Sequence, residues 1–162
     1  MCDAMVKRAA VTLVQSHTVH PGKFIILVRG GVDEVLESVN AGRRACKDAL
    51  VDHLILPNPH EQLLDVLEGQ RDVRVDAIGV FETYSVASAI RGADAALKAA
   101  EVEARSIRLA DDLGGKGYFV LSGALHDVEE AVAAGVKAAG SGLIAGQEII
   151  ANPHPDLVAS LS

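Results

Sequence analysis

The chain is poor in aromatic residues, since Phe, Tyr and Trp together make up 3% of its 162 residues and Trp is absent. Alanine, valine, leucine and isoleucine must therefore supply the core, and small side chains bury little area each. A hydrophobic share of 49% still supports a packed core and argues against disorder. Because such a core gains stability by association, we expect an oligomer.

Other absences narrow the function. The two cysteines, Cys2 and Cys46, provide no disulfide framework. No apolar run approaches the ~18 residues of a membrane span, and charges interrupt the first residues too often for a secretory signal. The net charge is −7, and the longest basic cluster is only Arg43, Arg44 and Lys47. We therefore expect a cytoplasmic protein that contacts neither membrane nor nucleic acid.

The sequence contains an internal duplication. Three blocks recur in the same order, at offsets that drift from 91 to 94 residues. They are "DAMVKRAAV" (3–11) and "DAALKAAEV" (94–102), Gly22-Lys23 and Gly115-Lys116, and "NPHEQL" (58–63) and "NPHPDL" (152–157). Such ordered matches indicate two copies of one domain.

The complete second copy predicts an α+β fold with the element order β-α-β-β-α-β, a ferredoxin-like unit. Its expected strands are 77–82, 103–111, 118–123 and 143–150, and its expected helices are 86–100 and 127–140. The predicted domains are 1–67 and 77–158, joined by a polar linker, 68–76. The first copy lacks the opening strand, so we expect the natural chain to begin upstream of Met1.

Several motifs resemble those of bacterial microcompartment shell proteins: "DAALKAAEVE", "GGKGYFVLSGALHDVEEAVAAG" and "NPHPDL". Two such domains in one chain are typical of the tandem-domain, trimeric type (BMC-T). "TVHPGKFIILVRGGV", "LVDHLILPNPH" and "AIGVFETYSVASAI" are most similar to the trimeric shell proteins of propanediol-utilisation compartments. The resemblance implies a homotrimer shaped as a pseudohexagonal disc. Such discs tile edge to edge with other shell proteins inside the cytoplasm and pass small metabolites, metals or electrons through a central pore.

The resemblance also implies that the turn between the second and third strands of each domain lines this pore. Those turns comprise Thr18, Val19, His20, Pro21, Gly22 and Lys23 in the first domain, and Asp112, Leu113, Gly114, Gly115 and Lys116 in the second. A phosphate-binding P-loop would need a hydroxyl residue after Gly-Lys and a helix to follow. Phe24 and Gly117 stand there, and a strand follows. The residues alone predict a plain hairpin turn.

His20 carries a further implication of the resemblance. A relative has a cysteine at the matching position, where three copies on the three-fold axis hold an iron–sulfur cluster. Three imidazoles can bind a metal ion such as zinc or iron, although they suit an all-thiolate cluster poorly. The interpretation we favour is a pore-lining side chain without a metal or cofactor.

In relatives, a lysine matching Lys7 and Lys98 lies along the edge between discs. The resemblance assigns the same edge to Asn58 and His60 and to their counterparts Asn152 and His154. For the lysines, an ordinary surface position is nearly as good an interpretation. Many single-domain shell proteins have arginine where the two asparagines stand, so we do not expect edge packing identical to theirs.

No catalytic constellation is present. Glu82, Tyr84, Ser85 and His126 invite a search for a nucleophile and a base, but they match neither a nucleophile elbow nor a zinc-protease motif. We therefore expect a structural shell protein and not an enzyme. Two alternatives remain open: a trimeric metal or iron–sulfur electron-transfer protein, and a ferredoxin-like ligand-binding regulator, against which the short loops count.

Overall fold

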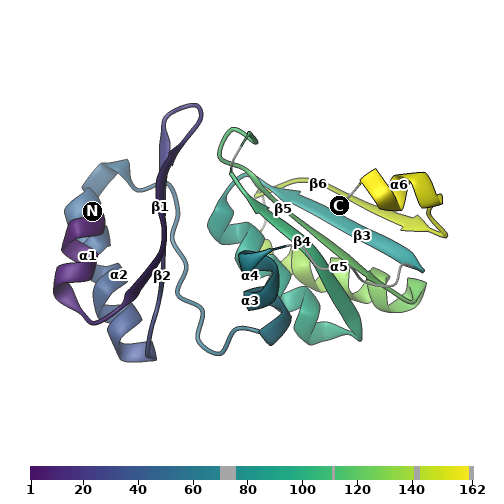
Figure 1. Cartoon of the computed structure of the whole chain (residues 1–162), viewed down its shortest axis with the longest axis horizontal. Helices are drawn as coiled ribbons and strands as arrows, with labels where there is room; N and C mark the ends of the chain where they lie inside the picture. Colours follow the sequence, from purple (N-terminus) through teal and green to yellow (C-terminus); the bar gives the residue numbers. More distant parts are fainter. Residues whose placement is uncertain (70–75, 111, 141–142, 161–162) are drawn as a thin grey trace. The chain divides into compact units, whose positions relative to one another are not determined.

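The computed structural model of the chain describes residues 1–69, 76–110, 112–140 and 143–160. The chain forms two compact units, Met1–Pro57 and Asn58–Ser162 (Figure 1). The boundary lies before the end of the predicted first domain, so residues 58–68 belong structurally to the second unit. Most of the predicted linker, and Asp111 beside the second turn, lie outside the described residues.

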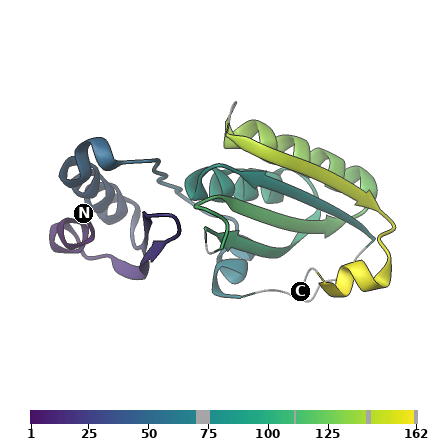
Figure 2. The ribbon, with the colours of Figure 1, turned by 90° about the horizontal axis from the view of Figure 1, so that it is seen from above.

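The second unit contains a four-stranded antiparallel sheet with the strand order β4-β5-β3-β6. Helices α4 and α5 lie side by side on one face of this sheet (Figures 1 and 2). The elements are α3 (Glu61–Glu68), β3 (Ala77–Thr83), α4 (Val86–Ala99), β4 (Val102–Leu109), β5 (Gly117–Gly123), α5 (Leu125–Ala139), β6 (Ile144–Ala151) and α6 (Pro155–Ser160). The predicted β-α-β-β-α-β order is confirmed, and each predicted boundary falls within two residues of the observed one.

The core of the second unit lies between its sheet and these two helices. Phe81 on the central strand β3 and Phe119 on β5 are fully buried, with ring centroids 5.7 Å apart. The helices cross at two glycines, Gly92 and Gly135, directly over the Phe81 ring. Because neither glycine has a Cβ atom, the two backbones approach more closely than other residues would allow.

The first unit repeats part of this architecture. Its elements are α1 (Cys2–Arg8), β1 (Thr12–Val19), β2 (Lys23–Arg29), α2 (Val32–Cys46) and the 3₁₀ helix η1 (Lys47–Ala49). Strands β1 and β2 form an antiparallel hairpin whose register shifts between Leu13 and Gln15. The hairpin β4–β5 shifts at the matching place, between Ala104 and Ser106. The duplication therefore extends to an irregularity of the backbone.

The sheet of the first unit has only two strands. Residues 1–57, all of which the structure describes, contain no counterpart of β3. The closing strand that the repeat predicts is also not formed, because residues 50–57 are not part of a strand. In the second repeat, among the described residues, the matching strand β6 pairs with β3 alone. Without an equivalent of β3, residues 50–57 have no neighbour with which to form a ladder.

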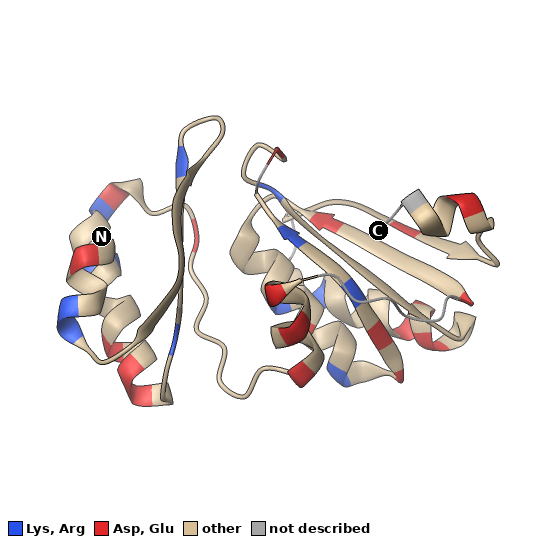
Figure 3. Cartoon of the chain, in the orientation of Figure 1, with Lys and Arg blue, Asp and Glu red and all other residues tan. Residues whose placement is uncertain are grey.

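Acidic and basic residues occur in both units (Figure 3), and helix α3 carries Glu61, Asp65 and Glu68 without a lysine or arginine. This distribution agrees with the absence of a basic cluster in the sequence. Among the described residues, no helix combines the length and the apolar character that a membrane crossing requires.

Candidate functional site: two hairpin turns and a joint between the repeats

The turn between β4 and β5 is closed by its own backbone. The amide of Ala110 donates to the carbonyl of Lys116 (2.8 Å), and that of Leu113 donates to the carbonyl of Ala110 (3.0 Å). Positive φ angles occur at Ala110, Asp112, Gly114 and Gly115. These bonds connect Ala110 with Leu113 and Lys116, two of the five predicted pore residues of this turn.

Lys116, the last residue of this turn, forms an ion pair. Its Nζ atom lies 2.7 Å from Oε1 of Glu82 on β3, and both side chains are partly exposed. The carboxylate therefore offsets the charge of the turn's lysine. From the sequence, Glu82 was expected only as a catalytic candidate. Its role depends on the sheet register, in which Glu82 lies opposite Tyr118, two residues after Lys116.

The turn between β1 and β2 is shorter. The peptide bond between His20 and Pro21 is cis, and the amide of Gly22 donates to the carbonyl of Val19 (3.0 Å). Gly22 has a φ angle of 108°, which residues with a Cβ atom rarely adopt. Val19 is buried, whereas His20, Pro21 and Gly22 are exposed. The predicted pore residues at the tip therefore face away from the core.

The donor groups near His20 do not suit a cysteine-ligated cluster. Cys2 lies at the start of α1 and Cys46 at the end of α2, so neither turn contains a thiol. Within the described ranges, no three His, Cys, Asp or Glu side chains gather closely enough to hold a metal ion. One chain offers a single imidazole at this turn, and a metal site there would need other copies of the chain.

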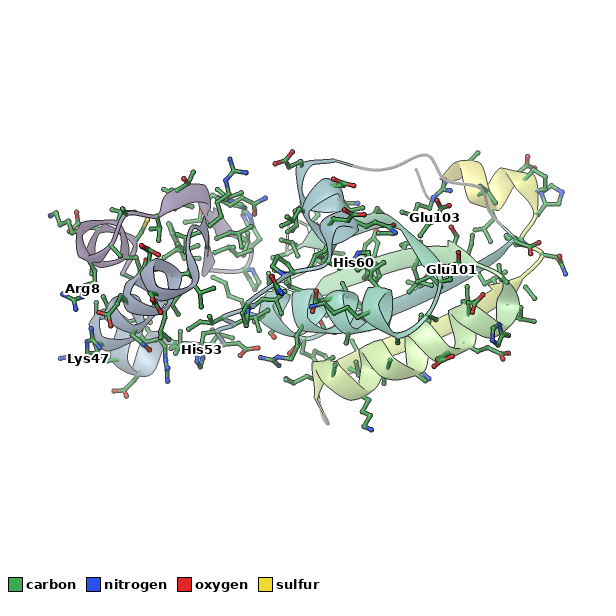
Figure 4. All side chains as sticks on the ribbon, turned by 90° about the horizontal axis from the view of Figure 1, so that it is seen from below. Arg8, Lys47, His53, His60, Glu101 and Glu103 are labelled. Carbon is green, nitrogen blue, oxygen red and sulfur yellow. The ribbon has the colours of Figure 1, made fainter. Side chains whose placement is uncertain are left out.

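Two predicted edge residues of the first repeat, Asn58 and His60, meet the second repeat at a joint, formed by residues 58–68 packed against α4 and β4. Within it we call residues 58–60 the first NPH turn. The amide of His60, labelled in Figure 4, donates to Oδ1 of Asp94 on α4 (2.8 Å). Nζ of Lys98 donates to the carbonyl of Asn58 (2.8 Å) and lies 2.6 Å from Oδ2 of Asp94. The Asp94 side chain is only 8% exposed, and its charge is compensated by both contacts.

Helix α3 completes the joint. Leu63 and Val66 are buried, and α3 packs on β4 and α4. The Gln62 side chain lies along the outer edge of β4, where its Oε1 accepts from the amide of Ala104 (2.8 Å) and its Nε2 donates to the carbonyl of Val102 (3.4 Å). One amide side chain thus forms hydrogen bonds with two backbone groups on the outer edge of β4, where no neighbouring strand pairs with them. Sequence reasoning missed Gln62, whose counterpart in the second repeat is Asp156.

We expect Gln62→Ala to speed hydrogen exchange of the Ala104 amide several-fold and to lower the free energy of unfolding by about 1 kcal/mol, since that amide loses its acceptor. Amide exchange followed by NMR measures this directly. Gln62→Glu is the matched control, because a carboxylate still accepts from Ala104 although it cannot donate to Val102. Equal exchange in all three proteins would show that Gln62 does not protect the edge.

The repeat counterparts of Lys98, Asn58 and His60 are Lys7, Asn152 and His154, and all three are exposed. Lys7 pairs with Asp3 on α1 at 2.8 Å, in the first unit. Asn152 and His154 lie exposed between β6 and α6, in the second unit. The structure therefore brings together Lys98 and the first NPH turn, as an internal contact of the second unit.

The catalytic candidates either make local structural contacts or lie exposed at the surface. The Ser85 hydroxyl accepts from the amide of Ser88 (3.1 Å) and so caps helix α4. His126 lies beside Asp127 on the surface of α5, and Tyr84 is exposed at the end of β3. The described residues bring none of these groups into a nucleophile–base arrangement.

The fold and its paired turns define a tandem-repeat α+β protein built from ferredoxin-like units. The BMC domain matches residues 1–59 and 77–153, which places one domain on each repeat. The chain therefore belongs to the BMC-domain family of bacterial microcompartment shell proteins. These findings confirm three predictions from the sequence: the family, the tandem organisation and the structural shell role.

Individual relatives support the assignment. The bacterial microcompartment shell protein PduT of Citrobacter freundii is 39% identical over 157 residues, which cover 96% of this chain and 85% of PduT. The carboxysome shell protein CcmK2 of Synechococcus elongatus is 44% identical over 69 residues, which cover 40% of this chain and 68% of CcmK2. A crystal structure of a microcompartment protein from Desulfitobacterium hafniense DCB has a TM-score of 0.87 at 38% identity, covering 98% of this chain and 89% of that one.

Proposed function

We propose that three copies of this chain close into a pseudohexagonal disc that forms part of a microcompartment shell in the bacterial cytoplasm. Three chains with two repeats each supply six similar wedges, and a ring is the closed form of such an assembly. The observation that carries the proposal is the matched pair of hairpin turns, one in each repeat. A role as a wall tile also accounts for the lack of a catalytic grouping among the described residues.

In this proposal the two turns alternate around a central pore. The first contributes the exposed His20 and the half-buried Lys23, and the second contributes Asp112 and Lys116, whose side chain pairs with Glu82. The pore rim then carries two kinds of charge in alternation, which selects permeating metabolites by their charge as well as by their width.

The edge between discs is the second part of the proposal. We assign to it Lys7 and Lys98 together with Asn58, His60, Asn152 and His154. Lys98 supports this assignment because its side chain stays 43% exposed even while it holds the first NPH turn. A neighbouring shell protein can then contact the outer side of the same lysine.

Native mass spectrometry tests the proposal. The chain has a mass of 16.9 kDa, so a trimer of about 51 kDa is expected. A protein that remains a monomer at all concentrations would contradict the shell role.

If the three first turns meet on the pore axis, a cysteine placed in this turn should give the trimer a new ability to bind an iron–sulfur cluster. In a protein whose native cysteines are replaced (Cys2→Ser, Cys46→Ser), we expect His20→Cys to bind iron and sulfide on anaerobic reconstitution, because three thiolates then meet on the axis. A broad visible absorption band would report the cluster. Val51→Cys, at an exposed position outside either turn, is the control and should stay colourless. A colourless His20→Cys trimer would contradict the convergence.

A further inference from the structure

We propose that the second NPH turn (residues 152–154) of one chain docks on the Asp3–Lys7 pair of a second copy, through the same contacts that join the two repeats within a chain. The inference rests on the proposed trimer and names the surface that closes it. The inference is based on two matches. The second NPH turn resembles the first NPH turn, and the Asp3–Lys7 pair, which we call the receptor, resembles the Asp94–Lys98 pair that binds the first NPH turn.

The docking element is already built in the second repeat. Asn152 has a φ angle of 48°, as its counterpart Asn58 has one of 55°. Nδ1 of His154 accepts from the amide of Asp156 (3.2 Å), as Nδ1 of His60 accepts from the amide of Gln62 (3.3 Å). The two NPH turns thus share a left-handed asparagine and the same histidine-capped start of a helix. What one turn binds, the other has the geometry to bind.

The receptor is also built. Asp3 and Lys7 form an i,i+4 ion pair of 2.8 Å on α1, where Asp94 and Lys98 form one of 2.6 Å on α4. The chain leaves both helices through the same bend: the amide of Val11 donates to the carbonyl of Ala9 (2.9 Å), as the amide of Val102 donates to that of Ala100 (3.0 Å). The strand edge that follows is therefore presented in the same way.

The two receptors differ in occupancy. The side chains of Asp3 and Lys7 are 75% and 74% exposed, and among the described residues their charged groups bond only to each other. Asp94 is 8% exposed, because the first NPH turn covers it. The exposed pair is thus the same receptor without its turn. A second copy of the chain carries the turn that fits.

The predicted contacts follow residue by residue. Nζ of Lys7 donates to the carbonyl of Asn152 of the second copy, and the amide of His154 donates to Oδ1 of Asp3. Asp156 replaces Gln62 at the strand edge, and a carboxylate can accept from the amide of Leu13 but cannot donate to the carbonyl of Val11. The joint between copies therefore has one hydrogen bond fewer than the joint within a chain. We therefore expect the joint between copies to dissociate more readily than the joint within a chain.

Disulfide cross-linking of the full chain tests the proposal. In the protein carrying Cys2→Ser and Cys46→Ser, the pair Asp3→Cys with His154→Cys is oxidised and separated on a denaturing gel. The matched control is the pair Asp94→Cys with His60→Cys, which reports whether the joint geometry permits a disulfide. We expect a covalent trimer from the first pair and a linked band of single-chain mass from the control.

The outcomes separate the inference from the proposed function. If native mass spectrometry shows a trimer and the control forms its disulfide, but the first pair stays unlinked or closes within one chain, the docking is wrong while the disc stands. If the protein is a monomer, the disc itself is wrong. A covalent trimer supports both.

A milder substitution guards against loss of the fold. Lys7→Ala removes an exposed side chain, so each unit should fold unchanged, while dissociation of the trimer should increase about tenfold for each of its joints. Sedimentation equilibrium over a range of protein concentrations measures this change. Lys137→Ala, an exposed lysine in the last turn of α5, should leave dissociation unaltered. Equal dissociation of the two variants would overturn the docking.

Discussion

Replacing Phe81 by alanine should lower the free energy of unfolding of the second unit by about 3–5 kcal/mol. Phe81 is completely buried, stands on the central strand of the sheet and contacts both helices that cover it. Its ring also packs on Phe119 in a tilted arrangement.

Urea denaturation followed by circular dichroism measures this change. Tyr84→Ala is the control, since it removes an aromatic ring at the end of the same strand where the side chain is 53% exposed. We expect its effect to stay within about 0.5 kcal/mol. Similar losses for the two variants would mean that the core is not centred on Phe81.

Gly135→Ala should destabilise the second unit by about 1–3 kcal/mol through overpacking. A Cβ atom at this position would lie 2.9 Å from the carbonyl oxygen of Gly92 and 2.9 Å from the Phe81 ring. Neither neighbour can move easily, because one is backbone and the other is a buried ring. The helices would have to separate, and the contacts of both with the sheet would weaken.

The first repeat offers a matched control for this substitution. Gly42 is the counterpart of Gly135, and a Cβ atom there would meet the side chain of Met5 at 2.6 Å. Methionine is flexible and can change rotamer, so Gly42→Ala should cost less than Gly135→Ala. Thermal unfolding of both variants gives the comparison. A larger loss for Gly42→Ala would contradict the argument that rigid neighbours decide the cost.

Local signals in the sequence were sufficient for much of the fold. Val128, Val132 and Val136 recur every four residues, a spacing typical of the inner face of a helix. In α5 the first two are buried and Val136 is partly buried, and Gly140, with a φ angle of 102°, ends the helix. The repeat predicted the element order because each matched block keeps its local pattern.

The misses came from contacts between segments distant in the chain. Residues 50–57 have the composition of a strand, but a strand requires a partner and the counterpart of β3 is absent from residues 1–57. Glu82 meets Lys116 only through the sheet register, and Gln62 meets β4 only through the joint. The matched starts of the two blocks, Asp3 and Asp94, were a usable signal. An aspartate four residues before a lysine occurs in both copies and forms an ion pair in each, Asp3 with Lys7 and Asp94 with Lys98.

The joint held by Gln62 and the first NPH turn affects how the sequences of the two repeats can diverge. Because the joint lies within one chain, the local concentration of its two sides is fixed by the linker and does not fall on dilution. In the proposed trimer, by contrast, the contact at Asp3 and Lys7 on α1 forms between separate chains and weakens on dilution. Two copies of one domain, once fused, are free to diverge at matched positions. A fused pair can acquire two different pore turns and two joints of unequal strength, which six identical subunits cannot do.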